Sequence, residues 1–232
     1  MNKAGYKPYR FVGFDNNTDN TATNWNQQYN PNYDSKITVA MIDEFLLEFP
    51  NCSLSSENCV TIDGEVYLLV GNEKYSLGFS NYYSHSNTID PINPLSAYET
   101  SRKLTPAAII YYVCVENDMN VVWVLANLQK EQSLIEQHLS SYQVRLNRAI
   151  GYMYFDSSSG RRHYNEGEKF CGFIGQVVGG SYQFKKYCDK GMNMEQAYNT
   201  YTPSTEAGNM KYGEFMKNIY EPYCEWFEQH IN

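Results

Sequence analysis

Charged residues are scarce in this chain, and basic residues are scarcer than acidic ones. Of its 232 residues 19% are charged, with 18 Lys and Arg against 26 Asp and Glu, which gives a net charge of −8. Phosphate backbones are bound by clustered Lys and Arg, but here basic residues stand together only in pairs such as Arg161-Arg162 and Lys185-Lys186. The composition therefore argues against general nucleic-acid binding. An acidic inhibitor that mimics nucleic acid is a weaker alternative.

Long hydrophobic runs are also absent. No eighteen apolar residues follow one another, so the sequence predicts no membrane-spanning helix. The first eight residues, Met1 to Pro8, contain no apolar stretch of the kind that a secretory signal needs. We therefore expect an intracellular or virion protein whose six cysteines are reduced.

The motifs of common catalytic and cofactor sites are missing as well. There is no HExxH, no paired CxxC and no calcium-loop pattern for a metal site. There is no GxGxxG, Walker A or GxSxG sequence for a dinucleotide, a nucleotide or a nucleophilic serine. The sequence predicts neither a cofactor nor a metal.

Aromatic residues, by contrast, are abundant: 16% of the chain, including 22 Tyr. Residues 1–34 are rich in Asn, Thr and Asp and lack an apolar period, which is typical of a surface loop or a frayed terminus. The same residues carry several large aromatic side chains, which favours an extended arm that docks on a neighbour. The side chains expected at that interface are Phe11, Phe14, Trp25, Tyr29 and Tyr33.

Residues 35–155 are expected to form an α+β core. A helix over Ile37 to Phe49, capped by Asp34 or Ser35 and ended by Pro50, is followed by a β-meander over residues 59–79. The pair Asp63-Gly64 predicts a type I′ turn between its first two strands.

The stretch from Pro106 to Tyr154 is the centre of this core and has two interpretations. Its β-branched and aromatic runs, 107–115 and 121–125, predict a β-hairpin, followed by a long amphipathic helix over 128–153 with Asn127 as its N-cap. The apolar stripe also extends back to Leu104, and Thr105-Pro106 could cap and begin a single very long helix. We favour the hairpin.

Residues 156–232 are expected to form a mostly helical region packed on the same core. Helices are predicted over 170–178, over 192–201, and through Phe215 and Ile219, with a kink or restart at Pro222. The predicted fold class is thus α+β: a meander and a hairpin packed with a long amphipathic helix, and a helical C-terminal part.

The one catalytic candidate is Cys171. Phe170-Cys171-Gly172-Phe173-Ile174 loosely resembles the cysteine segment of cell-wall and papain-like peptidases, in which a helix N-terminus lowers the thiol pKa and a histidine acts as base. His163 and His85 are the weak candidates for that base. The resemblance implies a cysteine-dependent hydrolase, but the histidines do not stand where those folds place them.

The function favoured by these features is a non-enzymatic assembly or protein-binding component. Tyr, Asn, Ser and Gly together supply rigid contact area and adaptable hydrogen bonds, a mixture typical of recognition surfaces. The expected partner is another protein or a second copy of the chain. An excess of Lys over Arg and the many Asn and Tyr residues suggest a viral, for example phage, structural protein. The cysteine hydrolase is the alternative.

Overall fold

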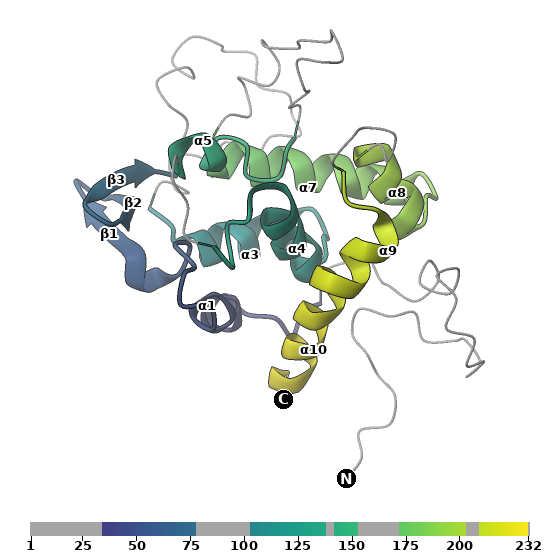
Figure 1. Cartoon of the computed structure of the whole chain (residues 1–232), viewed down its shortest axis with the longest axis horizontal. Helices are drawn as coiled ribbons and strands as arrows, with labels where there is room; N and C mark the ends of the chain where they lie inside the picture. The colour runs from purple at the N-terminus through teal and green to yellow at the C-terminus, as the bar shows by residue number, and fades with distance from the viewer. Residues whose placement is uncertain (1–33, 78–102, 138–141, 153–171, 203–208, 232) are drawn as a thin grey trace, which may run out of the picture.

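The computed structural model describes residues 34–77, 103–137, 142–152, 172–202 and 209–231 (Figure 1). Helix α4 (Val121–Gln132) lies at its centre, and every residue from Val121 to Gln129 is buried. Helices α3 (Pro106–Glu116) and α10 (Glu221–His230) pack against it, while α1 (Val39–Leu47) packs on both of these. A three-stranded antiparallel sheet lies beside the helices, which confirms the α+β class.

Helix α1 begins later than the sequence indicated. Thr38 is its N-cap and accepts a hydrogen bond from the backbone N–H of Met41. Asp34 instead caps the preceding turn, where its carboxylate accepts from the N–H of Lys36 and its carbonyl from the N–H of Ile37. The buried face of α1 consists of Ile42, Phe45 and Leu46.

The predicted meander is confirmed. After a 3-10 turn, η2 (Ser56–Asn58), strands β1 (Cys59–Ile62), β2 (Glu65–Val70) and β3 (Glu73–Ser76) pair in the order β1-β2-β3. Asp63 and Gly64 both have positive φ, 52° and 81°, as a type I′ turn requires at its two central positions. Val66 and Leu68 of β2 are buried in the core.

The predicted hairpin is wrong, because residues 107–115 and 121–125 lie in the two helices α3 and α4. The caps that the rival interpretation used are real: Thr105 accepts a hydrogen bond from the N–H of Ala108, and Pro106 is in the first turn. Helices buried on most sides are as apolar as central strands. Tertiary burial has here outweighed the β propensity of Val, Ile and Tyr.

The residues taken for a hairpin turn end α3. Asp118 has a φ of 48°, and the next N–H, of Met119, donates to the carbonyl of Cys114 at 2.8 Å. This is a Schellman ending, with Met119 fully buried as the accompanying apolar contact. Asn120 then caps α4 by accepting from the N–H of Trp123. Asn127, the predicted cap, lies inside α4 and donates to the carbonyl of Trp123.

The long helix over 128–153 is also wrong, as is the single helix of the rival interpretation. Helix α4 ends at Gln132, where Ser133 adopts a left-handed conformation with φ 53°. The buried side-chain oxygen of Gln129 accepts from the N–H groups of Ile135 and Glu136 and holds the turn in place. The chain re-enters a short helix, α5 (Tyr142–Leu146).

The C-terminal region is helical, as predicted. Its elements are α7 (Phe173–Asp189), α8 (Met194–Tyr201), α9 (Tyr212–Phe215), a π-helical turn η6 (Met216–Tyr220) and α10. Pro222 has no N–H, and its ring would clash with the carbonyl of Asn218, so the wider π-turn directly before it accommodates the proline. The expected kink at this proline therefore takes the form of a π-bulge.

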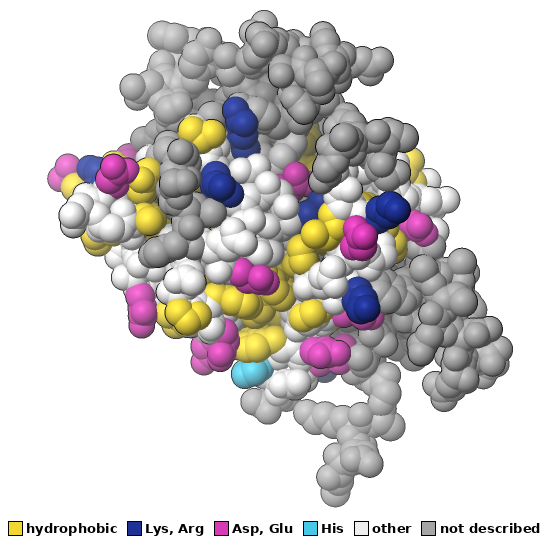
Figure 2. Space-filling view, viewed as in Figure 1, with side chains coloured by type: hydrophobic (Ala, Val, Ile, Leu, Met, Phe, Trp, Pro, Cys, Tyr) yellow, Lys and Arg dark blue, Asp and Glu magenta, His cyan; other side chains and the backbone are white. Residues whose placement is uncertain are grey.

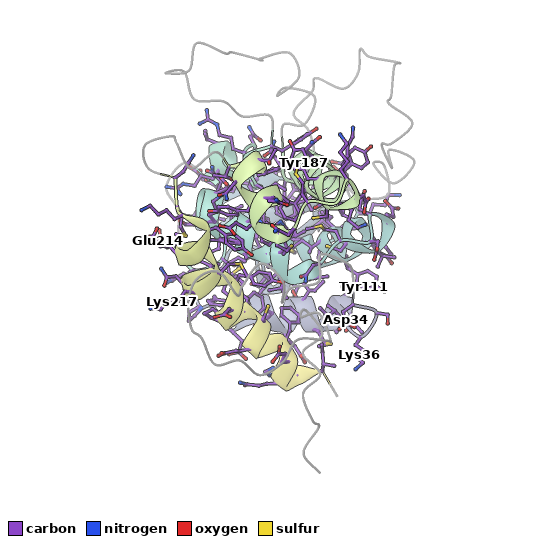
Figure 3. The ribbon with its side chains drawn as sticks, turned by 90° about the vertical axis from the view of Figure 1, so that its right-hand side faces the viewer. Asp34, Lys36, Tyr111, Tyr187, Glu214 and Lys217 are labelled. Carbon is purple, nitrogen blue, oxygen red and sulfur yellow. The ribbon has the colours of Figure 1, made fainter. Side chains whose placement is uncertain are left out.

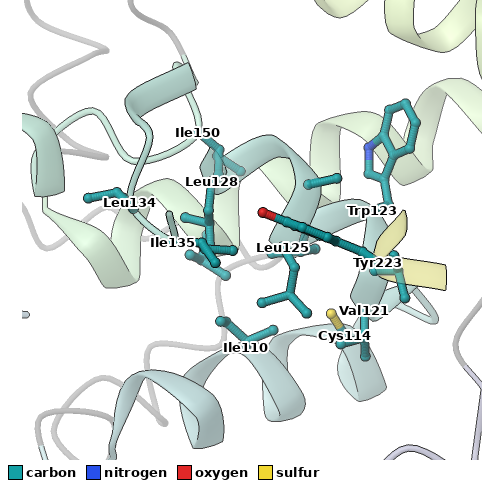
Figure 4. Packing of buried hydrophobic residues seen from close by; sticks show 14 of the residues in the cluster. Ile110, Cys114, Val121, Trp123, Leu125, Leu128, Leu134, Ile135, Ile150 and Tyr223 are labelled. Carbon is teal, nitrogen blue, oxygen red and sulfur yellow. The ribbon is translucent and has the colours of Figure 1, made fainter. Parts of the chain in front are cut away.

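One hydrophobic cluster extends from Ile37 to Phe227 and joins the described parts of 35–155 and 156–232. Figure 4 shows how α3 contributes Ile110 and Cys114 to it, under Leu125 of α4. The ring of Trp123, 3% exposed, lies 4.1 Å from that of Phe184. The boundary expected at 155/156 lies outside the described residues.

Candidate functional site

The sequence-predicted site residues all lie outside the described parts of the chain. This holds for Cys171, His163 and His85, and for the five aromatic side chains of the expected arm: Phe11, Phe14, Trp25, Tyr29 and Tyr33. The helix predicted over 170–178 exists, but it begins at Phe173 with Gly172 as its N-cap, and it extends to Asp189.

Four of the five free thiols that the structure describes have a raised pKa. Desolvation by burial raises the pKa of Cys59 to about 11 and that of Cys52 and of Cys188 to about 12. It raises the pKa of the fully buried Cys114 further. Since the thiolate is the reactive form, burial disfavours these four groups as nucleophiles near neutral pH.

Lys130, at the C-terminal end of α4, is the centre of a buried polar cluster. Its side chain is 4% exposed, and its Nζ donates to the carboxylate of Glu131 at 2.5 Å and to the hydroxyl of Thr202 at 2.6 Å. The same Nζ lies 4.5 Å from the centre of the Tyr198 ring. Desolvation lowers the pKa of Lys130, and the charge of Glu131 opposes that shift.

A buried lysine with a lowered pKa is a common feature of active sites, which makes this cluster a candidate. Here, however, the ammonium already has two hydrogen-bond acceptors and a ring face, and almost none of it is exposed. The carboxylate of Glu131 is 22% exposed and is enclosed on the side of Gly151, where an added Cβ would lie 3.0 Å from its Oε2. Among the described residues, the cluster joins the end of α8 to the end of α4 and leaves almost none of the ammonium exposed to a substrate.

The surface of α3 is different in kind. From Pro106 to Val115 this helix contains no charged residue. Its inner side is buried, but Tyr112 is 49% and Val115 42% exposed, and the half-buried Tyr111 lies with its ring 5.3 Å from that of Tyr112. Val115 follows Tyr112 by about one helical turn, and these three side chains form what we call the α3 face. Tyr111 lies at the periphery of the molecule in Figure 3.

Such a face is unusual for a surface helix, whose outer side normally carries polar and charged groups. Helix α1 has that ordinary pattern, with Glu44 exposed. On α3 the first charge is Glu116 at the C-terminal end, where partial burial raises its carboxyl pKa. The α3 face is therefore a partly exposed apolar surface with an acidic end.

The outer face of the sheet also exposes apolar side chains, but it is less apolar than the α3 face. Ile62 and Leu69 are each 38% exposed there. However, Lys74 lies over the ring of Tyr67 at 4.4 Å, and the Tyr67 hydroxyl donates to Glu65. Figure 2 shows charged side chains among the hydrophobic ones over this sheet. The apolar groups are thus interrupted by charge, unlike those of α3.

The described residues contain neither a metal-ligand group nor a membrane-spanning helix. Among the described residues no group of three His, Cys, Asp or Glu side chains could hold a metal ion. None of the described helices is both long and apolar enough to cross a membrane. Comparison with known proteins finds no matching family model, no similar curated protein and no similar solved structure.

Proposed function

We propose that this chain is a non-enzymatic assembly component that self-associates through the α3 face. One observation carries the proposal: a surface helix that is free of charge over its first ten residues and exposes Tyr112 and Val115. Tyrosine is enriched among the side chains that contribute most to protein–protein binding energy. Contiguous exposed apolar surface on a folded chain is typical of an interaction site.

The α3 face is the centre of the proposed interface and not the whole of it. A stable interface buries about 800 Å² on each partner, which is more than three side chains can supply. Polar residues around α3 would form the rim, as in most interfaces. The cysteine hydrolase alternative depends on Cys171, which lies outside the described residues. The finer assignment to a virion is supported by composition alone.

The test is the mass of the protein in solution over a wide concentration range. The double variant Tyr112→Glu, Val115→Glu places two charges on the α3 face, and their desolvation in a contact would oppose association. We expect the wild-type mass to rise with concentration in sedimentation equilibrium and the double variant to stay at the mass of one chain. Circular dichroism and thermal melting check that the fold is kept.

Val144→Glu is the matched control. Val144 on α5 is 49% exposed, as much as Tyr112, but it lies on another helix. This variant should associate like the wild type. Equal association of the α3 double variant and the wild type would refute the proposed role of the α3 face.

A further inference from the structure

If the chain self-associates through the α3 face, one segment of the second copy must lie on that face. We infer that it is the N-terminal segment, residues 1–33, of a second copy of the chain. This inference rests on the proposed function, and it identifies the partner of the same surface. Three observations support it: the exposure of the face in a single chain, the charge of the two parts, and the aromatic content of the segment.

The exposure of the face leaves apolar area that a second chain could bury. In the single chain Tyr112 and Val115 keep 49% and 42% of their surface accessible. Burial of large apolar side chains favours association, so a few such contacts can offset the entropic cost of fixing a segment on the face. A second copy is a partner that is always present when the first is.

The charge of the segment is opposite in sign to that of the rest of the chain. Residues 1–33 contain three basic and two acidic residues, Lys3, Lys7 and Arg10 against Asp15 and Asp19, for a net charge of +1. Residues 34–232 contain 15 basic and 24 acidic residues, for a net charge of −9. Two such bodies repel each other, whereas the segment and the body attract.

The basic residues of the segment would be attracted most strongly to the acidic end of the α3 face. Glu116 lies at the C-terminal end of α3, where the helix dipole adds partial negative charge. Direct pairing of α3 with α3 of another copy would bring two such acidic bodies together. A segment whose first ten residues carry three positive charges and no negative one avoids that cost.

Chemistry and length also match. The segment's aromatic side chains Phe11, Phe14, Trp25, Tyr29 and Tyr33 suit a face made of two tyrosines and a valine. Fully extended, 33 residues reach about 110 Å, whereas the eleven residues of α3 span only about 16 Å. Such a head-to-tail contact closes into a ring, or a reciprocal dimer, or continues as a filament, depending on its geometry.

The experiment uses the full chain with Trp25 replaced by the photo-crosslinking residue p-benzoylphenylalanine. Equal amounts of ¹⁴N- and ¹⁵N-labelled protein are mixed, irradiated and digested, and crosslinked peptides are read by mass spectrometry. We expect peptides that join residue 25 of one isotope to residues 106–116 of the other. Crosslinks confined to one isotope would show a strap within one chain and overturn the inference, as would crosslinks to other surfaces.

A complementation test uses the same logic without crosslinks. Tyr112→Glu, Val115→Glu removes the face, and Phe14→Ala, Trp25→Ala removes the segment's anchors. Each variant alone should associate about tenfold more weakly or worse, and mixing the two should restore a dimer, because one supplies the face and the other the segment. No dimer in the mixture overturns the inference. If only the face variant loses association, the proposed self-association stands and the segment is not its partner.

Discussion

Helices α3 and α4 follow each other in the chain and begin alike, yet they are used differently. Each starts with eight or more uncharged residues behind an Asn or Thr cap. Helix α4 is buried on every side from Val121 to Gln129, whereas α3 is buried on one side and exposes Tyr112 and Val115 on the other. A similar uncharged composition is thus buried on every side in α4 and is partly exposed in α3.

The difference separates two properties of the protein. Side chains of α4 hold the fold together, so changing them should lower the free energy of unfolding. The two exposed side chains of the α3 face, Tyr112 and Val115, contribute little packing within one chain, so changing them should alter association and leave stability nearly as it is. The following predictions test this separation, starting with the largest expected change in stability.

Trp123→Ala should have the largest effect. The Trp123 ring is in contact with Phe184 and, edge-on at 5.1 Å, with Phe215, and removing it leaves a large cavity. Truncation of a buried tryptophan typically costs about 3–5 kcal/mol of unfolding free energy. Urea denaturation followed by circular dichroism measures the loss.

Tyr112→Ala is the counterpart on α3, and it should change the unfolding free energy by no more than about 0.5 kcal/mol under conditions where the protein is monomeric. A loss as large as that of Trp123→Ala would mean that the α3 face is part of the chain's own core.

Lys130→Ala tests the buried ammonium group at the end of α4. The change leaves the carboxylate of Glu131, 22% exposed, without its cation. Removing one partner of a buried pair costs about 3–5 kcal/mol, and because water reaches Glu131 we expect about 2–3 kcal/mol. Association should be unaffected, since the lysine is buried away from the α3 face.

Two variants control for this effect. The double variant Lys130→Met, Glu131→Gln removes both charges and should recover part of the loss. Lys185→Ala breaks ion pairs with Asp189 and Asp118, whose side chains are 60% and 57% exposed, and should cost less than about 1 kcal/mol. If Lys130→Ala cost no more than Lys185→Ala, the buried pair would not stabilise the fold.

The sequence predicted best where short-range chemistry decides the structure. Asp63-Gly64 required a tight turn and made one, and Pro222 disturbed the last helix as expected. The prediction failed at residues 107–125, because a helix that is apolar on most sides lacks the polar stripe that identifies helices. Thr105 and Pro106 were the correct signal, and the β propensity of the following residues outweighed them in our interpretation.

The end of α4 could not be predicted for a different reason. Nothing in the local pattern indicates that the amide of Gln129 binds two N–H groups beyond the helix. The α3 face could not be predicted either, because its residues were assigned to a β-strand. The uncharged run from Pro106 to Val115 is visible in the sequence, but α4 begins with a similar run. Only the structure shows that α4 is buried on every side and that α3 lies nearer the surface.

A small effect at neutral pH is expected for Tyr212→Phe. The Tyr212 hydroxyl is buried beside Tyr198 and has no hydrogen-bond partner among the described residues, so its loss should be neutral or stabilise by up to about 1 kcal/mol. Tyr198→Phe is the matched control: it removes a hydrogen bond to the carbonyl of Met210 and should cost about 1 kcal/mol.

The pH dependence sharpens this last prediction. Desolvation raises the pKa of Tyr212 above its ordinary value, and the neighbouring carboxylates add to the shift. In the unfolded chain the phenol ionises near pH 10, so the folded state binds more protons above that pH and loses stability as the pH rises. Phenylalanine cannot ionise, and the variant should therefore gain roughly 1–1.5 kcal/mol over the wild type between pH 7 and pH 11. Urea denaturation at the two pH values measures the gain, and equal slopes for both proteins would show that the Tyr212 hydroxyl is accessible to water after all.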